Sequence, residues 1–294
     1  MEDNNFEGPI PDWLGEFEHL KYLIIGVNMF SGSIPTNLGN LSSLIVLDVG
    51  SNTLTGVVSE RNLAKLSKLK ALYIGSHSTL IFDFHSHWIP PFQLQELYLQ
   101  FSNPNLPSWL YTQGSIESLT ISESSFAAHD KFWNFVSRMT EVQLQDNVID
   151  GNMSNVLLNS TFIDLSSNGL KGCLPRFSPN VVIASLKNNS LSGDMSALLC
   201  DHKMLNEKNN LVNLDISQNH LSGGLTNCWK NWKSLVAIHL GSNNLSGKIP
   251  SSMGLLSNLT SLNLHENKLH GEIPPSLQNC RSLLVFNVRN NHLS

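Results

Sequence analysis

Apolar residues recur along this chain at fixed distances from a series of asparagines. Three of them precede each asparagine by eight, five and three positions, as Leu235, Ile238 and Leu240 do before Asn243. An apolar residue follows two positions after the asparagine, glycine four positions after it and often proline seven positions after it. Successive asparagines are 24 residues apart from Asn219 onward. A sequence period in this range is typical of a solenoid, in which each repeat forms one coil.

The repeat assigns a structural role to each position. The apolar residues at −5 and −3 have the period of a strand with one buried face, so a short strand should end near the asparagine. The asparagine should point inward, because its amide can bond backbone groups of adjacent coils that would otherwise be buried unpaired. The glycine at +4, such as Gly32 or Gly247, permits a turn with positive φ.

We therefore predict an α/β repeat solenoid over residues 1–294, with about 12 or 13 repeats of about 24 residues, incomplete at both ends and without recognisable caps. The predicted architecture is a right-handed superhelix with a parallel β-sheet on its concave side and mostly irregular or 3-10 segments on its convex side. His77, Ser102 and Ser124 take the place of the asparagine in three repeats. Residues 202–210 form a polar insertion.

Composition excludes several classes of function. The formal net charge is −5, charged residues make up 14% of the chain, and no basic run occurs, so we expect no nucleic-acid partner. No stretch approaches 18 apolar residues, so we expect no transmembrane segment in this sequence. The N-terminus also lacks the apolar core of a signal peptide.

Motifs that carry chemistry are incomplete in this sequence. Residues 241–248 resemble a phosphate-binding loop but have one residue too many between the glycines. His265, Glu266 and His270 resemble a zinc-protease motif, but the second histidine stands at i+5 instead of i+4. We expect no enzymatic activity, no cofactor and no bound metal.

The four cysteines have different expected roles. Cys280 occupies a core position and should be a small buried hydrophobe, whereas Cys173 lies in a turn and should be exposed. Cys200 and Cys228 fall at similar positions of consecutive coils, which is compatible with a disulfide. The sequence does not supply the Cα separation that would decide it.

Six sequons for N-glycosylation occur, and their use requires a secretory route. About this number is expected by chance in a chain so rich in Asn, Ser and Thr, so the count itself decides nothing. The candidate asparagines are Asn40, Asn152, Asn159, Asn188, Asn244 and Asn258.

The Leu-x-Gly-x-Ile-Pro frame at this spacing resembles the plant-specific class of extracellular leucine-rich repeats. Residues 88–94, 107–110, 199–200 and 228–235 resemble plant receptor-like proteins more narrowly, in particular the subgroup that perceives fungal xylanase. The resemblance implies a glycosylated ectodomain on the extracellular side of the plasma membrane. It further implies a protein or peptide ligand and a co-receptor or adaptor kinase as signalling partner. Contact with the membrane would be made only through a segment absent from this sequence.

Two groups of residues on the predicted concave face are candidates for ligand binding. The first comprises Tyr22, Ile24, Tyr73, Tyr98 and Phe101, because rings bring large contact area at low entropic cost. Tyr73 and Tyr98 have an alternative role as a cross-strand pair that only packs together. The second group is a column formed by His239, His265 and Arg289, which is suited to an acidic ligand.

The sequence thus favours a ligand-recognition segment of a plant receptor-like protein that acts in defence or development. Three alternatives stay open: a secreted leucine-rich-repeat inhibitor of a pathogen enzyme, a fragment of a receptor-kinase ectodomain, and a non-functional truncation. Fold alone does not decide between them.

Overall fold

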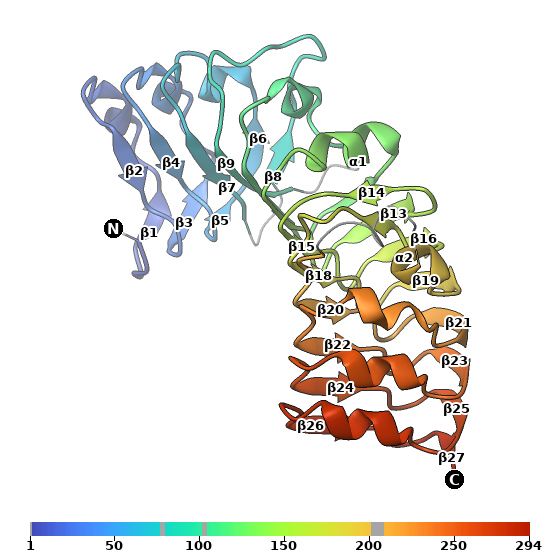
Figure 1. Cartoon of the computed structure of the whole chain (residues 1–294). Helices are drawn as coiled ribbons and strands as arrows, with labels where there is room; N and C mark the ends of the chain where they lie inside the picture. The colour runs from blue at the N-terminus through green and yellow to red at the C-terminus, as the bar shows by residue number, and fades with distance from the viewer. Residues whose placement is uncertain (1, 77–79, 102–104, 201–208) are drawn as a thin grey trace. The chain divides into compact units, whose positions relative to one another are not determined.

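A computed structural model describes residues 2–76, 80–101, 105–200 and 209–294 (Figure 1). The chain divides into two compact units, the first ending at Ala127 and the second spanning Ala128–Ser294, and each is described by itself. The repeat landmarks predicted at His77 and Ser102, and most of the polar insertion, lie outside the described residues. The prediction of one array over residues 1–294 stays a prediction.

The first unit is a stack of coils, each of which contributes one strand to a parallel main sheet. In chain order the main sheet contains β2 (Tyr22–Ile24), β4 (Val46–Asp48), β7 (Ala71–Ile74), β9 (Glu96–Gln100) and β10 (Ser118–Ser122). Shorter strands follow the turns, namely β1 (Glu7–Pro9), β3 (Met29–Gly32), β5 (Thr53–Leu54), β6 (Gly56–Val58), β8 (Leu80–Phe82) and β11 (Ser125–Ala127). The return segments carry the 3-10 helices η1 (Asp12–Glu16), η2 (Thr36–Asn40), η3 (Glu60–Asn62) and η4 (Ser108–Thr112).

The second unit repeats this plan with a seven-stranded parallel main sheet. Its strands are β12 (Glu141–Gln143), β15 (Phe162–Asp164), β18 (Ile183–Ser185), β20 (Asn213–Asp215), β22 (Ala237–His239), β24 (Ser261–Asn263) and β26 (Val285–Asn287). The strands after the turns are β13 (Val148–Asn152), β16 (Gly169–Gly172), β19 (Ser190–Gly193), β21 (His220–Gly224), β23 (Asn244–Gly247), β25 (Lys268–Gly271) and β27 (His292–Leu293). The returns carry α1 (Asp130–Val136), the paired strands β14 (Leu157–Leu158) and β17 (Arg176–Phe177), α2 (Ser196–Leu199), η5 (Cys228–Asn231), η6 (Ser251–Leu255) and η7 (Pro275–Asn279). Stacked parallel strands with mostly irregular or 3-10 returns confirm the predicted solenoid in both units.

The buried asparagines bond neighbouring coils together, as the sequence predicted. Asn52 is fully buried, and its Nδ2 donates to the carbonyl oxygens of Val49 and Gly50 in its own coil and of Ile25 in the preceding coil, at 3.0–3.1 Å. Its Oδ1 accepts the N–H of Phe30 at 3.0 Å. The same pattern of own-coil and preceding-coil partners recurs at Asn168, Asn189, Asn219, Asn243, Asn267 and Asn291. One side chain thereby satisfies several backbone groups that would otherwise be buried without a hydrogen-bond partner.

The turns on either side of the asparagine have positive φ. The glycine at +4 has φ between 74° and 90° in every repeat that supplies one except at Gly151, which confirms its predicted role in all of these coils but one. The residue just before the asparagine is also left-handed although it is not glycine, for example Val27 at 52° and Ser242 at 55°. This conformation is unfavourable for a side chain with a Cβ, most of all a β-branched one, so hydrogen bonds around the asparagine must offset its cost.

The structure joins Cys200 and Cys228 in a disulfide whose Cα atoms are 5.4 Å apart. This bond links α2 to the start of η5 in the next coil. Cys280 is buried and Cys173 is exposed, which confirms both expectations. The disulfide lies beside Trp232, whose indole nitrogen donates to the carbonyl oxygen of Leu199 at 3.1 Å.

Replacing Asn52 by alanine should test the asparagine ladder, by which we mean the buried asparagines that bond each coil to the preceding one. The change removes four hydrogen bonds and leaves buried carbonyl groups unpaired, so we expect a loss of about 3 kcal/mol in the free energy of unfolding. Denaturant titration measures it, with Asn37→Ala as the control because Asn37 is exposed. Equal stabilities of the two variants would contradict a stabilising role for the ladder.

Removing the disulfide should destabilise the second unit. The bridged cysteines are 28 residues apart, and loop-closure entropy for such a loop corresponds to about 3.5 kcal/mol. We expect the double variant Cys200→Ser, Cys228→Ser to melt well below the parent under oxidising conditions. Under reducing conditions the two proteins should melt at nearly the same temperature, and a persistent difference there would mean that the serines themselves disturb the packing.

Candidate functional site

The outward side chains of the first unit's main sheet form rows across the strands. In register, Ile24 lies opposite Asp48, Asp48 opposite Tyr73, and Tyr73 opposite Tyr98. Tyr22 is 57% exposed and Ile24 is 36% exposed, whereas the alternate residue Leu23 is buried. Tyr22 and Ile24 therefore point outward, as the strand period requires.

Tyr73 and Tyr98 are half-buried, and their hydroxyl groups are fixed by polar neighbours. The Tyr73 hydroxyl donates to the carboxylate of Glu96, and the Tyr98 hydroxyl lies 2.7 Å from Ser122 Oγ. Burial raises the pKa of Tyr73, and the hydrogen bond to Glu96 and the charges of Glu96 and Asp48 raise it further. Both rings are thus held in place on the sheet before any ligand arrives.

Three glycines form the floor beneath these side chains. Gly26, Gly50 and Gly75 stand at the same position of three consecutive coils, two residues before the asparagine position. A Cβ at Gly75 would lie 2.7 Å from Cε1 of Tyr98, and one at Gly26 would lie 2.5 Å from a carboxylate oxygen of Asp48. Glycine therefore lets an aromatic ring and a carboxylate lie flat against the sheet. Sequence reasoning missed this column, although the glycine spacing of 24 and 25 residues was its signal.

Asp48 is the acidic member of the same row. Burial raises the pKa of its carboxyl group, while the N–H of Gly50, which donates to Asp48 Oδ1 at 2.9 Å, opposes this shift and the charge of Glu2 adds to it. In the structure its side chain is half-buried over Gly26.

The prediction that Phe101 faces the ligand is wrong. Phe101 is 3% exposed, and its ring lies between Phe82 and Phe126, with centroids 5.6 and 6.5 Å away. Its N–H donates to Ser124 Oγ, so Phe101 takes the core position that Phe30 fills two residues after an asparagine. The chain turns inward early in this coil, and the register counted from Ser102 therefore assigned Phe101 to the wrong side.

In the second unit, His239, His265 and Arg289 lie on three neighbouring strand ends, as predicted, but each already has polar partners. His239 Nδ1 is 3.6 Å from Asp215 Oδ2, and Arg289 is 3.5 Å from Glu266 Oε1. His265 Nδ1 lies 2.6 Å from Asn263 Oδ1. Two of the three side chains thus already face a carboxylate and the third faces an amide oxygen.

Two carboxyl groups of this column have lowered pKa values. For Asp215, burial acts against ionisation, but hydrogen bonds from His239 and Ser217 and the charge of His239 hold the pKa below its usual value. For Glu266, the hydrogen bond from Ser242 is the largest cause, and His265 and Arg289 add to it. Both acids therefore stay charged near neutral pH. That this column binds an acidic group stays a prediction.

The six sequon asparagines differ in accessibility. Asn40, Asn152, Asn188, Asn244 and Asn258 are exposed. Asn159 is half-buried, since its Nδ2 donates to the carbonyl oxygen of Ser137 and its Oδ1 accepts from Asn180. Occupancy by glycans stays a prediction for all six.

Residues 2–76, 80–101, 105–200 and 209–294 contain neither a metal-binding cluster nor a membrane-spanning helix. Within those ranges no three His, Cys, Asp or Glu side chains gather so that they could hold a metal ion. No helix in that part of the chain is both long and apolar enough to span a bilayer.

Comparison with known proteins identifies the repeat and its relatives. The Leucine Rich Repeat family matches residues 210–232, 234–256 and 258–280. Receptor-like protein EIX2 of Solanum lycopersicum is 32% identical over 187 residues, which cover 61% of this chain and 18% of that protein. Receptor-like protein EIX1 of the same plant is 34% identical over 127 residues, or 41% of this chain and 12% of that protein. The matched part of the chain thus spans less than a fifth of the length of these relatives.

Solved structures confirm the fold. The ectodomain of the Arabidopsis thaliana receptor kinase GASSHO1/SCHENGEN3 matches 99% of this chain and 41% of its own length, at 26% identity and a TM-score of 0.68. An internalin from Listeria monocytogenes matches 100% of this chain and 80% of its own at 20% identity and a TM-score of 0.66, which shows the fold alone. The leucine-rich-repeat solenoid and the similarity to plant receptor-like proteins are therefore both confirmed.

Two matched variants should isolate the contribution of His239 to the second unit. Asp164 and Asp215 each accept hydrogen bonds from the N–H and the hydroxyl group of a serine two residues later. Of these two aspartates, only Asp215 also contacts His239. We expect Asp215→Asn to lower the free energy of unfolding by about 1 kcal/mol more than Asp164→Asn does at pH 5–7. This difference is modest because His239 is partly exposed.

The pH dependence of that difference follows from the direction of the pKa shift. Because the folded pKa of Asp215 is lowered, its contribution to stability is present above the unfolded value of about 3.9 and is lost as the pH falls through the folded value. Denaturant titrations at pH 6, 4 and 3 should show the gap between the variants closing toward the lowest pH. A gap that is constant with pH would rule out the ion pair as its cause.

Proposed function

We propose that this leucine-rich-repeat protein, which is similar to plant receptor-like proteins, is a recognition segment that binds a protein or peptide. The proposed contact area is the tyrosine surface, formed by Tyr22, Ile24, Tyr73 and Tyr98 on the outward side of the first unit's main sheet. The observation that carries the proposal is that Ile24, Tyr73 and Tyr98 lie in one row across the strands, with Asp48 between Ile24 and Tyr73. Tyr22 lies two residues before Ile24 on the same outward face of β2. Tyr22 and Ile24 are 57% and 36% exposed, so their side chains are available to a ligand.

The physical properties of the tyrosine surface suit recognition. Tyrosine offers a large contact area with few rotatable bonds, and here two hydroxyl groups are already held by Glu96 and Ser122. Ordering these side chains on binding therefore costs little conformational entropy.

The class of ligand is supported by a structural relative with 26% sequence identity. The GASSHO1/SCHENGEN3 ectodomain was solved in complex with CASPARIAN STRIP INTEGRITY FACTOR 2. We take from this only that the same solenoid presents a surface to a partner molecule in a plant receptor. A role in defence or in development is part of our proposal.

A location outside the cell is supported by the chemistry of the chain. The Cys200–Cys228 disulfide is of a kind that persists in oxidising compartments and is rare in the cytosol. We propose that the protein acts on the extracellular side of the plasma membrane and signals with a co-receptor or adaptor kinase. The proposal assigns recognition to the chain and no reaction.

Truncating the tyrosine surface should weaken binding without unfolding the protein. The probe is a purified fungal xylanase, the ligand class that the resemblance to receptor-like proteins implies. Tyr22→Ala with Ile24→Ala removes two exposed side chains, and loss of an anchoring pair should cost about 2 kcal/mol, a decrease in affinity of about thirtyfold. Surface plasmon resonance gives the affinity, and calorimetry should give an unchanged melting temperature.

The control is Val148→Ala, because Val148 is a 67% exposed apolar residue of the second unit. It should bind like the parent. Tyr98→Phe additionally tests whether the hydroxyl contact with Ser122 preorganises the ring. Failure of the parent to bind the xylanase would contradict the ligand class, and equal affinity of all variants would contradict the surface.

A further inference from the structure

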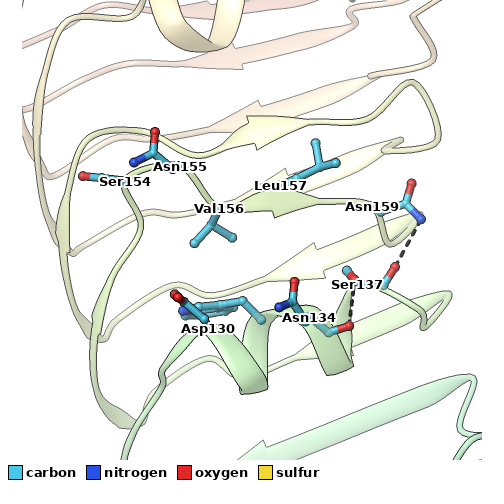
Figure 2. Close-up of a pocket in the computed structure, with 9 residues that line it drawn as sticks. Asp130, Asn134, Ser137, Ser154, Asn155, Val156, Leu157 and Asn159 are labelled. Carbon is cyan, nitrogen blue, oxygen red and sulfur yellow. Dashed lines mark hydrogen bonds between the residues drawn. The ribbon is translucent and has the colours of Figure 1, made fainter.

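A hollow of about 570 Å³ lies on the return side of the second unit, beside α1 (Figure 2). Its origin is a change in the type of return segment. One coil returns through the helix α1, and the following two, with asparagines only 21 residues apart, return through the two-residue strands β14 and β17. A helix is broader than a strand, so the change from one to the other leaves a step. The volume is within the range of ligand pockets, about 300–1,000 Å³.

One wall of the hollow is the unpaired edge of β14. This strand pairs with β17 alone: the N–H groups of Arg176 and Ser178 donate to the carbonyl oxygens of Val156 and Leu158, both at 2.9 Å. Alternate residues of a strand direct their backbone groups to opposite edges. The N–H and C=O of Leu157 therefore point away from β17, and no described residue bonds to them. An unpaired edge of this kind is a template for another extended chain.

The other wall carries a single charge. Asp130 and Asn134 lie one turn apart on α1, on the side that faces the hollow in Figure 2, and both are exposed. Among the residues that the structure describes, Asp130 is the only charged side chain that lines the hollow, and none of them forms an ion pair with it. A ligand here should be neutral or positively charged, because an anion would face an uncompensated carboxylate.

The burial of Trp133 favours a peptide over a sugar as the ligand of this hollow. It also lines the hollow but is only 4% exposed, so its ring has almost no free face on which a saccharide could stack. Its buried Nε1 has no hydrogen-bond partner in the part of the chain that the structure describes. Leu157, in contrast, is 48% exposed and offers an apolar contact beside the strand edge.

We propose that this hollow binds an extended peptide segment carrying a basic residue, which adds a strand to the free edge of β14. The peptide backbone bonds to the N–H and C=O of Leu157, and the basic side chain pairs with Asp130. This is strand addition, in which main-chain bonds supply affinity and nearby side chains supply selectivity. The site is separate from the tyrosine surface, so either assignment can fail without the other.

The experiment uses the unglycosylated full chain, because Asn159 also lines the hollow and is a sequon. The probes are an acetylated and amidated peptide of sequence Thr-Val-Lys-Val-Thr, the same peptide with Glu in place of Lys, and cellotetraose. We expect calorimetric titration to show binding of the Lys peptide and at least tenfold weaker binding of the Glu peptide. Amide hydrogen exchange of Leu157 should slow in the complex.

Two substitutions at one position separate the backbone contact from the side-chain contact. Leu157→Pro deletes an N–H that the β14–β17 pair does not use, and proline is tolerated on such an edge, so the fold should be retained. Leu157→Ala keeps this N–H and removes only the exposed side chain. We expect the proline variant to bind the Lys peptide at least tenfold more weakly than the parent, and the alanine variant to stay within about threefold.

Asp130→Asn tests the charge, and it should abolish the preference for Lys over Glu. If the proline variant melts at a lower temperature than the parent, two other measurements test the proposed strand addition. These are the hydrogen exchange of Leu157 in the parent and the preference of Asp130→Asn between the Lys and Glu peptides. The proposal is overturned if the Lys peptide does not bind, if Leu157→Pro binds it like the parent while folded, or if Leu157 exchange is unchanged. Binding of cellotetraose in preference to both peptides would likewise replace the proposed strand addition by a saccharide site.

Discussion

The buried asparagine amide is the interaction on which both units depend. A coil without it would bury several backbone carbonyl and amide groups with no partner, at a cost of about 1–3 kcal/mol for each. Asn219 shows the arrangement: its Nδ2 reaches Ile216 and Ser217 in its own coil and Leu186 in the preceding coil, at 2.9–3.2 Å. The preceding Gln218 adopts a left-handed conformation with φ of 56°. The amide thus fixes both the local turn and the distance between coils.

The asparagine ladder and the apolar positions stabilise each coil from within. The residues at the outward strand positions are therefore not required for the stability of the coil. The first unit uses this freedom for Tyr22, Ile24, Tyr73 and Tyr98, and the second for alternating acids and imidazoles. Both units use glycine in the same way at the edge of this face. Gly241 makes room for the ring of His265 as Gly75 does for Tyr98, since a Cβ at either glycine would overlap the ring above it.

The sequence alone predicted those features that the repeat itself determines. The solenoid, the inward asparagines and the glycine turns follow from a pattern with a known period, and each was confirmed, except that Gly151 has no positive φ. Phe101 was assigned to the wrong side, because a coil that turns inward early cannot be placed by counting from its neighbours. The half-burial of Tyr98 was also missed, since it depends on the absence of a side chain at Gly75 in the adjacent coil. The burial of an outward side chain thus depends on residues of the adjacent coil, which the pattern of a single repeat does not include.

The short coils show which part of a repeat can vary. Asn168 and Asn189 stand only 21 residues apart, yet they still bond the preceding coils through Leu144 and Leu165, at 2.7 and 2.9 Å. The three lost residues must therefore come from the return side, where a two-residue strand replaces a helix. Such a strand cannot pair with a helix on its other side, so shortening a coil leaves a free backbone edge. Variation in repeat length thus creates a free backbone edge away from the main sheet, while variation in residue type shapes the outward face of the sheet.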